Sequence, residues 1–469
     1  MGAITNMRPD LWNGIIAQVK DQLGWKITDR RIYSLHHLHD KREFLTEVAA
    51  YGPVGHFRIG SQEVFLLSDA DAIEDVLVTR AGQFAKGRAL ERAKQTLGEG
   101  LLTSEGGVHL RQRHLMQPAF HKARIAAYGE AMTRAAVETR DRWQQDVPLD
   151  LSREMNRLTL AIVSDTLFGA EVGSDSDTAR VQQAITDVME MFDLVMVPFA
   201  DWLVHLPLPR MRRYREAQDT LDRTIYGIIG ARRKSSEDRG DLLSMLLRAQ
   251  DTEGAGGGMT DRQLRDEVIT LFLAGHETTS NALNWTWVLL GRNPAAEQHL
   301  HAELDCVLGG RAPTTDDLPR LSYTRAVVAE SMRLYPPAWT MGRRALKDYH
   351  WAGYDIPAGA LILMSQWVMH RDPRFWPDPE RFDPTRWLEE RRDRPRFAYF
   401  PFGAGNRVCI GEGFAWTEAM LLIATIAQKW RLVVDPAHPI EPLPLITLRT
   451  KHGVRATPEN RLQASGSRL

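Results

Sequence analysis

A long, uninterrupted helical pattern places the strongest constraint on how this chain of 469 residues folds. The pattern starts at Thr260, which forms a capping box with Gln263, and it ends at Asn293-Pro294. A helix of about 32 residues is about 50 Å long, enough to cross the whole molecule. We therefore expect this helix to run through the centre of the fold.

The middle of this helix has an unusual composition. Residues 274–279 read Ala-Gly-His-Glu-Thr-Thr, in which small residues precede an acid and two hydroxyls, a poor helix interior. Hydroxyls can donate to earlier carbonyls and distort the helix locally. Glu277 beside Thr278 in such a groove suits proton delivery to a bound ligand. The alternative is a close helix crossing at Ala274-Gly275 with solvated polar neighbours.

Cys409 stands in a glycine-rich loop that leads into another helical pattern. Residues 402–411 read Phe-Gly-Ala-Gly-Asn-Arg-Val-Cys-Ile-Gly, and an apolar helical pattern follows from Phe414. A helix mouth favours a thiolate, and Arg407 can donate to an anionic group beside it. The glycines let the backbone approach a flat group closely. These features match what a cysteine-ligated haem iron requires, and a buried structural cysteine is the alternative.

Glu330 and Arg333 are three residues apart and therefore share one face of a predicted helix. The proline pair at 336–337 stops that helix, and the later segment 378–384 (Asp-Pro-Glu-Arg-Phe-Asp-Pro) supplies Arg381. We expect two arginines around one glutamate to fix the loops that lead to the cysteine. An ordinary surface ion pair, which stabilises little, is the alternative.

Composition excludes several classes of protein. With 59 basic and 60 acidic residues, no global field favours nucleic acid or anionic lipid, and two cysteines exclude a disulfide framework. No apolar run approaches the roughly 20 residues that cross a bilayer, and the first residues lack a signal-peptide layout. We expect a cytoplasmic protein. An apolar stripe at 11–23 could lie on a membrane surface, but we favour packing against the protein body.

Strand patterns are few and lie at 56–67, 340–344, 361–366 and around 443–448. No repeat or low-complexity block divides the chain. We therefore expect a single domain over 1–469, mainly α-helical with a minor β-sheet. Its expected parts are a β-rich N-terminal part (about 1–80), a helical bulk (about 81–460) and a polar C-terminal tail (about 458–469).

Taken together, these motifs resemble the cytochrome P-450 superfamily. Residues 402–411 match its haem-binding loop, F-x-x-G-x-R-x-C-x-G, at every defined position. Glu330 and Arg333 match its Glu-x-x-Arg helix, and Arg381 matches the arginine of Pro-Glu-Arg-Phe, which implies a structural triad. Residues 274–279 match its oxygen-binding groove. All four motifs occur in the family's order, and a weaker likeness covers nearly the whole chain.

The resemblance implies the P-450 fold, with haem b between the long helix and the cysteine loop. Cys409 then looks like the axial thiolate ligand of the iron. Thr278 and Glu277 resemble the pair that stabilises dioxygen and relays protons toward it. Ala274 and Gly275 would let haem and oxygen approach the helix.

Other haem contacts follow from the same resemblance. Arg407 and Arg343 fall where the family places partners of the haem propionates. His109 and Arg113 stand where the family often has Trp-x-x-x-Arg; a histidine can still donate to a carboxylate, and an exposed helix residue is the alternative. The cysteine loop also contributes Phe402, Gly403 and Gly411.

The substrate pocket of the family lies under a lid that corresponds here to about 178–212. This stretch is rich in methionine and aromatic residues, which either line the pocket or form ordinary core. If they line it, the substrate is largely apolar, such as a fatty acid, terpenoid or carotenoid. The candidate pocket residues are Leu101, Leu102, Met191, Phe192, Val195, Ala274, Ala338, Thr340 and Ile446.

The predicted activity is insertion of one oxygen atom of O2 into that substrate by hydroxylation or epoxidation. The chain has no dinucleotide motif or cysteine cluster, so electrons from NAD(P)H must come through a ferredoxin with its reductase or a flavodoxin-type donor. Arginines at 391–396 are candidates for that docking surface or for a solvated loop. We expect a monomer. A peroxide-using or rearranging haem-thiolate enzyme and a non-catalytic haem sensor are the alternatives.

Overall fold

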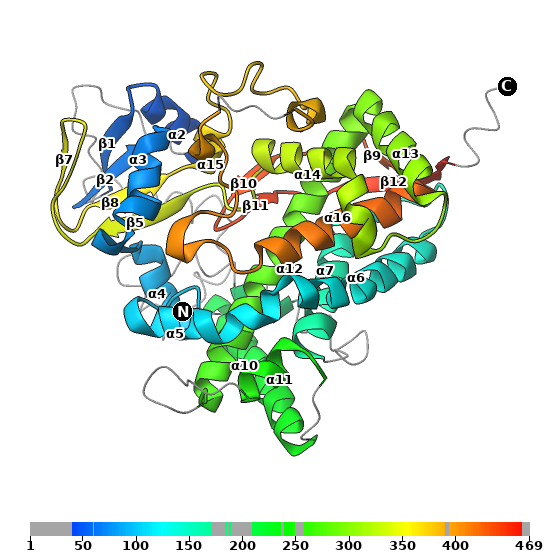
Figure 1. Ribbon diagram of the computed structural model, residues 1–469, viewed down its shortest axis with the longest axis horizontal. Coiled ribbons are helices and arrows are strands. Elements are labelled where there is room, and N and C mark those ends of the chain that lie inside the picture. Colours follow the sequence, from blue (N-terminus) through cyan, green and yellow to red (C-terminus); the bar gives the residue numbers. More distant parts are fainter. Residues whose placement is uncertain are drawn as a thin grey trace, which may run out of the picture.

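The computed structural model describes residues 40–59, 61–169, 183–184, 187–188, 209–235, 239–248, 258–389 and 394–461. The N-terminal stripe at 11–23 and the pocket candidates Met191, Phe192 and Val195 lie outside these residues. Figure 1 shows a helical body with a sheet at one end, and the described strands in that sheet come from the blue and yellow parts of the chain.

Helix α12 (Asp261–Arg292) confirms the predicted long helix. Its capping box is present: the Gln263 backbone N–H donates to the Thr260 hydroxyl over 3.2 Å, and the Gln263 side chain accepts from the Thr260 N–H over 2.9 Å. Nearly all of its central residues are buried, because α7 (Leu151–Phe168), α14 (Ser322–Leu334) and α16 (Glu412–Lys429) pack around it (Figure 1). A helix buried on every side must lie in the core.

The remaining described helices surround this core. In chain order they are α2 (Lys41–Ala49), α3 (Ala70–Glu74), α4 (Arg88–Leu97), α5 (Gly106–Met116), α6 (Lys122–Arg142), α10 (Pro209–Ser235), α11 (Leu242–Arg248), α13 (Pro294–Leu308) and α15 (Gln366–Met369). Helix α16 is apolar over most of its surface and packs against α6, α13 and α14 as well as α12. The mainly α-helical prediction is confirmed.

The main sheet has the strand order β1-β2-β8-β5-β3. Its strands are β1 (Val54–Ile59), β2 (Gln62–Leu67), β3 (Phe84–Lys86), β5 (Met341–Ala345) and β8 (Leu361–Met364). The predicted hairpin is present as β1–β2, and β2 pairs with β8 in parallel. The sheet thus combines strands from the first 90 residues with β5 and β8 from the later chain. The expectation of a β-rich part within about residues 1–80 did not include these later strands. Antiparallel β3 and β5 place Lys86 directly opposite Arg343.

Smaller sheets form from the later chain. They are β4 (Leu149–Asp150) with β12 (Arg455–Asn460) and β9 (Trp430–Val434), the hairpin β6 (Tyr349–Trp351) with β7 (Tyr354–Ile356), and the hairpin β10 (Pro442–Pro444) with β11 (Leu448–Thr450). Strand β12 continues to Asn460, so the segment expected as a polar tail from residue 458 begins as a paired strand.

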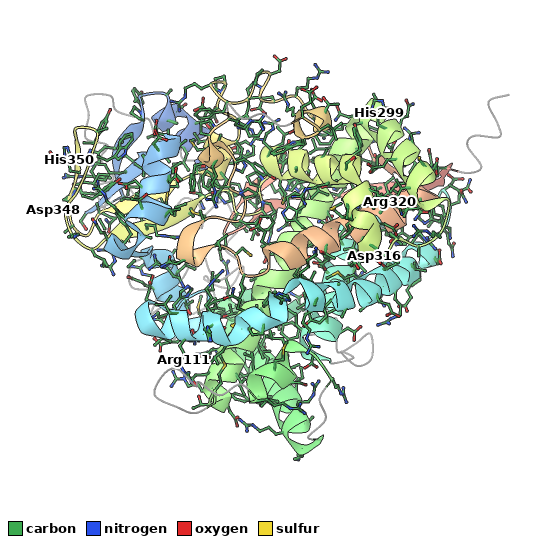
Figure 2. The ribbon with its side chains drawn as sticks, in the orientation of Figure 1. Arg111, His299, Asp316, Arg320, Asp348 and His350 are labelled. Carbon is green, nitrogen blue, oxygen red and sulfur yellow. The ribbon has the colours of Figure 1, made fainter. Side chains whose placement is uncertain are left out.

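Polar side chains at the rim mark the outside of this fold. Figure 2 shows Asp348 and His350 at the sheet end and His299 and Arg320 at the opposite end. Across the described ranges, no helix combines the length and the apolar character needed to cross a membrane.

Candidate active site

The Cys409 loop is held in one conformation by its backbone. Gly403 and Gly405 adopt φ angles of +69° and +68°, in the left-handed region that favours glycine. A side chain at Gly405 would collide with the carbonyl oxygen of Leu77. The Cys409 N–H donates to the Phe402 carbonyl over 3.0 Å. The loop therefore ends with the cysteine held by its own backbone, two residues before Gly411, which caps α16.

The Cys409 side chain is accessible, yet it is largely surrounded by protein. Burial raises the pKa of its thiol to about 11, although the Gly411 backbone N–H and the nearby Arg113 act in the opposite direction. The effect of the helix mouth on the thiol thus has the expected direction, and burial outweighs it. Metal binding requires the deprotonated form and itself displaces the proton. Arg113 donates to the Val408 carbonyl over 2.8 Å and so ties α5 to this loop.

Helix α12 offers one accessible patch within its buried length. Between Asp266 and Leu290, every residue is buried except Ala274, Gly275 and Thr278. These positions are spaced i, i+1 and i+4, so they share one face of the helix. The Thr278 hydroxyl donates to the Ala274 carbonyl over 2.7 Å, which is the local back-bonding that the sequence suggested.

The side chain of Glu277 points away from that of Thr278, contrary to the expectation that the two share one groove. Its carboxylate is buried and accepts from the Arg449 guanidinium over 2.8 Å and from the Thr447 hydroxyl. Successive helix residues point about 100° apart, so Glu277 faces the β10–β11 hairpin while Thr278 faces the accessible patch. Burial alone would raise the pKa of Glu277, but the adjacent Arg449 and Thr447 outweigh it and lower the pKa.

A cluster of cations lies near the cysteine loop. Arg407 donates to Glu105 over 2.6 Å and to the Phe84 carbonyl over 2.9 Å. Burial, with Arg407 close by, lowers the pKa of Arg343 to about 10. Burial also lowers the pKa of Lys86 to about 7, an effect that Glu105 only partly offsets. These three cations surround only one protein carboxylate, that of Glu105. The cluster could therefore bind the two carboxylates that haem b carries.

His109 belongs to this cluster. It is buried, its Nδ1 lies 3.2 Å from the Leu101 carbonyl oxygen, and the Lys86 Nζ lies 3.5 Å from the same nitrogen. The alternative of an exposed helix residue is therefore wrong. Burial, followed by the charge of Lys86, lowers the pKa of His109, so the ring is neutral near pH 7. No sequence motif marked Lys86; only the pairing of β3 with β5 brings it here.

These features fit haem b on this structure's own evidence. An exposed cysteine residue, an accessible patch on a buried helix and an excess of buried cations are what a flat, metal-bearing dicarboxylate would contact. The structural placement of Cys409, Arg343, His109, Ala274 and Gly275 is consistent with their predicted roles. Their contacts with the haem itself remain predictions.

Glu330 and Arg333 form a completely buried ion pair, with two N–H···O contacts of 2.8 Å. The surface-pair alternative is therefore wrong. The second arginine, however, is Arg386 and not Arg381: the Arg386 Nε lies 3.4 Å from a Glu330 oxygen. Arg381 instead accepts from Arg333 through its backbone carbonyl over 3.1 Å.

Local backbone geometry explains why Arg386, and not Arg381, approaches Glu330. The chain turns at a 3-10 segment, Pro384–Trp387, which directs Arg386 and Trp387 toward α14. The Trp387 indole N–H donates to Glu330 over 2.9 Å. The side chain of Arg381, two residues before that turn's cap, is exposed.

The described pocket candidates differ in their surroundings. Leu101 is buried, Ala338 and Thr340 are half-buried, and Leu102 and Ile446 are each 38% exposed. The Thr340 hydroxyl lies 3.5 Å from the Met364 carbonyl. Arg394 is one of the arginines predicted to bind the electron donor. Its guanidinium lies 3.8 Å from the centre of the Trp376 ring, so it packs against the protein and is not simply solvated.

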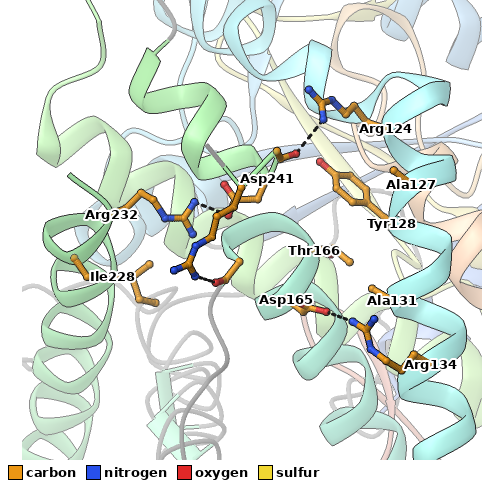
Figure 3. A pocket seen from close by; sticks show the side chains of 14 residues that line it. Arg124, Ala127, Tyr128, Ala131, Arg134, Asp165, Thr166, Ile228, Arg232 and Asp241 are labelled. Carbon is orange, nitrogen blue, oxygen red and sulfur yellow. Dashed lines mark hydrogen bonds and ion pairs between the residues drawn. The ribbon is translucent and has the colours of Figure 1, made fainter. Parts of the chain in front are cut away.

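A separate polar cleft of about 870 Å³ lies between α6, α7 and α10 (Figure 3). Its arginines are already bound within the protein: Arg232 pairs with Asp241 at 2.6 Å, and Arg134 pairs with Asp165 at 2.9 Å. Its lining residues include none from α12 or the Cys409 loop. We therefore assign the cleft to the packing of these helices and not to the reaction.

Comparison with known proteins identifies a matching family and several similar enzymes. The profile of the family described as cytochrome P450 matches residues 35–454. The chain is 42% identical to cyclooctatin synthase of Streptomyces melanosporofaciens, with 89% of this chain and 91% of the relative covered. It is 40% identical to cyclooctat-9-en-7-ol 5-monooxygenase of the same organism (83% and 84% covered). It is 36% identical to pentalenene oxygenase of Streptomyces avermitilis (86% and 90% covered).

The family match spans most of the chain and includes α12, the Glu330–Arg333 pair and the Cys409 loop. These are the same elements that bring an accessible sulfur, an accessible helix face and buried cations together. The chain belongs to the cytochrome P450 family.

Proposed function

We propose that this P450 monooxygenase hydroxylates or epoxidises a largely apolar terpenoid, either a hydrocarbon or an alcohol. The observation that carries the substrate class is the similarity to three enzymes named for such compounds: a cyclooctatin synthase, a cyclooctat-9-en-7-ol monooxygenase and a pentalenene oxygenase. Apolar pocket candidates such as Leu101, Ala338 and Ile446 support an apolar ligand.

Haem b, O2 and electrons from NAD(P)H through partner proteins supply the redox chemistry of this family. One oxygen atom enters the substrate and the other leaves as water, which consumes two electrons and two protons. The residues of this chain hold the reactants and the protons: Cys409 as the iron ligand, Lys86 and Arg343 with the haem carboxylates, and Thr278 on the oxygen side.

We infer a ferredoxin with its reductase or a flavodoxin-type protein as the electron donor, acting on a cytoplasmic enzyme. Helix α5 supports this inference, because Arg113 on it binds the carbonyl next to Cys409 and Arg111 lies toward the outside of the molecule (Figure 2). A cation on an element that touches the ligand loop would favour an acidic donor.

A binding screen tests the substrate class. Haem-loaded enzyme is titrated with terpenoid hydrocarbons and alcohols, with fatty acids and carotenoids as controls, while the haem spin state is followed. We expect shifts with the terpenoids; a shift confined to fatty acids or carotenoids would contradict the proposal. Turnover with a ferredoxin system, compared with turnover by hydrogen peroxide alone, then tests the electron source.

The ligand assignment has its own test. Cys409→Ser should abolish the thiolate-type spectrum of the reduced carbon monoxide complex, because a serine oxygen does not donate charge as a thiolate does. Cys306→Ser is the matched control, since Cys306 is the other exposed cysteine. An unchanged spectrum in Cys409→Ser would remove this residue from the iron.

A further inference from the structure

We propose that Glu267 of α12 is a positioning residue that determines substrate specificity, because it fixes the segment 98–104 as one wall of the substrate pocket. This segment lies between α4 and α5 and carries the pocket candidates Leu101 and Leu102. The inference rests on the proposed monooxygenase function. No sequence motif marked Glu267.

Glu267 starts from the same face of α12 as the accessible patch. It precedes Ala274 by seven residues and Thr278 by eleven, and both spacings fall within about 20° of whole helical turns. It therefore lies two turns, about 10 Å, from Ala274 along this face. Unlike the residues of the patch, Glu267 is completely buried.

The segment 98–104 lies directly against α12 at this level. A Cβ atom on Gly98 would collide with the Asp266 carboxylate, and one on Gly100 would collide with the Asp266 carbonyl oxygen. Gly98 also has a φ angle of +70°, which favours glycine. The backbone of the segment therefore approaches the helix closely beside Glu267 and covers its side chain.

Buried side chains bind both polar groups of the Leu101 backbone. Its N–H donates to Oε2 of Glu267 over 2.9 Å. Its carbonyl accepts from Lys86 Nζ over 2.8 Å, and Nδ1 of His109 lies 3.2 Å from the same oxygen. Buried backbone groups need such partners, and Leu101 lies outside the regular helices and strands that would supply them. Glu267 thus joins the candidate wall to α12.

The carboxyl group of Glu267 is otherwise poorly satisfied. Its Oε1 is buried without a hydrogen-bond partner among the described residues. Burial raises its pKa to about 8, and the charge of Asp266 acts in the same direction, while the Leu101 N–H and the charge of Lys86 oppose the shift. Asp266 differs, because it pairs with Arg265 at 3.0 Å. Near pH 7, Glu267 is therefore mostly a neutral acid, held by Leu101.

The Leu101 backbone determines where the wall stands. Leu101 is 8% exposed, and Leu102, the next residue, is 38% exposed, so a shift of this backbone moves both side chains. A well-packed apolar pocket distinguishes one methylene group by about 10- to 200-fold, and it does so only while its walls keep their positions. Glu267 acts on the substrate through Leu101, because its own side chain is completely buried.

Hydrogen exchange in the haem-loaded enzyme tests the contact without any substrate. Glu267→Gln and Glu267→Leu are both neutral, but only glutamine keeps an acceptor for the Leu101 N–H. We expect the Leu101 amide to exchange about threefold to tenfold faster in the Leu than in the Gln variant. The matched control is Glu297, a buried acid on α13, whose Leu and Gln variants should not differ at this amide. Equal rates in the two Glu267 variants would overturn the proposal.

Wild type against Glu267→Gln provides a pH readout. A raised pKa in an enclosed acid stabilises the closed segment below the ordinary value near 4.3, and this contribution is lost as pH rises through about 8. Protection of the Leu101 amide, relative to Glu267→Gln, should therefore fall from pH 5 to 8 by up to about tenfold per unit. Lys86 and His109 titrate in both proteins, so their contributions cancel. A ratio independent of pH would contradict enclosure of the acid by the segment.

Ligand affinities connect the wall to specificity. Dissociation constants are measured at pH 6 from the haem spin state, for the tightest-binding terpenoid of the screen and for an analogue that differs by one methyl group. We expect the ratio of the two constants to fall in Glu267→Leu and to stay near the wild-type value in Glu267→Gln and Glu297→Leu. An unchanged ratio in Glu267→Leu would overturn the specificity role. A screen without any ligand would contradict the proposed function, while the exchange experiments would still decide the contact.

A variant in the segment itself repeats the affinity test should Glu267→Leu fail to retain haem. Gly100→Ala pushes the segment away from α12, because its Cβ atom would lie too close to the Asp266 carbonyl oxygen. We expect the same fall in the affinity ratio with Glu267 unaltered. A ratio equal to that of wild type would show that the segment is not a wall of the pocket.

Discussion

Two of the glutamate–arginine pairs with a buried acid differ in how the acid is surrounded. In α14, Glu330 pairs with Arg333, three residues away, and both side chains are completely buried. In α12, Glu277 pairs with Arg449, 172 residues away on β11, and the arginine remains partly exposed. The residue types are the same, but the surroundings are not.

The difference lies in how completely each acid is satisfied. Glu330 accepts from Arg333, from the Trp387 indole and from the Asp383 backbone N–H, and Arg386 lies close by. Breaking the hydrogen bonds at both oxygens of a buried acid costs a large free energy, so Glu330 is suited to a structural role. Within the described residues, Glu277 has hydrogen-bond partners at Oε1 alone, so its carboxylate is held less completely than that of Glu330.

The largest expected effect comes from removing the satisfied acid. Glu330→Ala leaves the buried Arg333 without its counterion, which costs about 3–5 kcal/mol. Haem content and urea unfolding measure the effect, and we expect little haem-loaded protein. Glu91→Ala, which removes an exposed pair with Arg344, is the control and should cost about 0–1 kcal/mol. A stable, fully loaded Glu330→Ala protein would end the structural role.

A smaller effect distinguishes the two candidate arginines of this network. Arg386→Leu removes a largely buried cation beside Glu330 and should cost about 1–3 kcal/mol. Arg381→Leu should stay within about 0.5 kcal/mol, because that side chain is exposed and its backbone carbonyl persists. The urea midpoints of the two variants show which arginine stabilises the network. A larger loss of stability in Arg381→Leu than in Arg386→Leu would restore Arg381 to the triad.

A third buried acid, Glu418 on α16, sharpens the comparison. Burial raises its pKa to about 8, and the nearby Thr279 offsets this only in part. A raised pKa in an acid gives stability that is complete below the unfolded value and is lost as pH rises through the folded value. Wild type should therefore lose stability relative to Glu418→Gln between about pH 4.5 and 8. A constant Tm difference across that range would show that Glu418 ionises normally.

The smallest effect on folding is expected at Thr278. Its hydroxyl donates to the Ala274 carbonyl within the same helix, so Thr278→Ala should change the free energy of unfolding by about 0.5 kcal/mol or less. Its effect should instead fall on the reaction, because electrons are diverted to hydrogen peroxide when protons are poorly delivered. Thr279→Ala serves as the matched control on a buried face. Unaltered coupling in Thr278→Ala would remove its relay role.

Features that depend on neighbours within a few residues could be predicted from the sequence. The long helix with its capping box, the glycine turns of the cysteine loop and the Glu330–Arg333 pair are all of this kind. Their geometry follows from helix periodicity and backbone preference, which a short stretch determines alone. The family motifs are built from such stretches, so the candidate haem site was largely predictable.

Only the tertiary structure decided which distant groups meet. The pairing of β3 with β5 brings Lys86 beside Arg343, a turn after residue 383 selects Arg386 over Arg381, and the C-terminal hairpin supplies Arg449. Register and packing depend on the whole core, and one residue of shift changes every such contact. By itself the sequence predicted the candidate haem ligand and determined the central helix. The fold determined which cation faces the buried Glu277, because that choice depends on a strand 172 residues away.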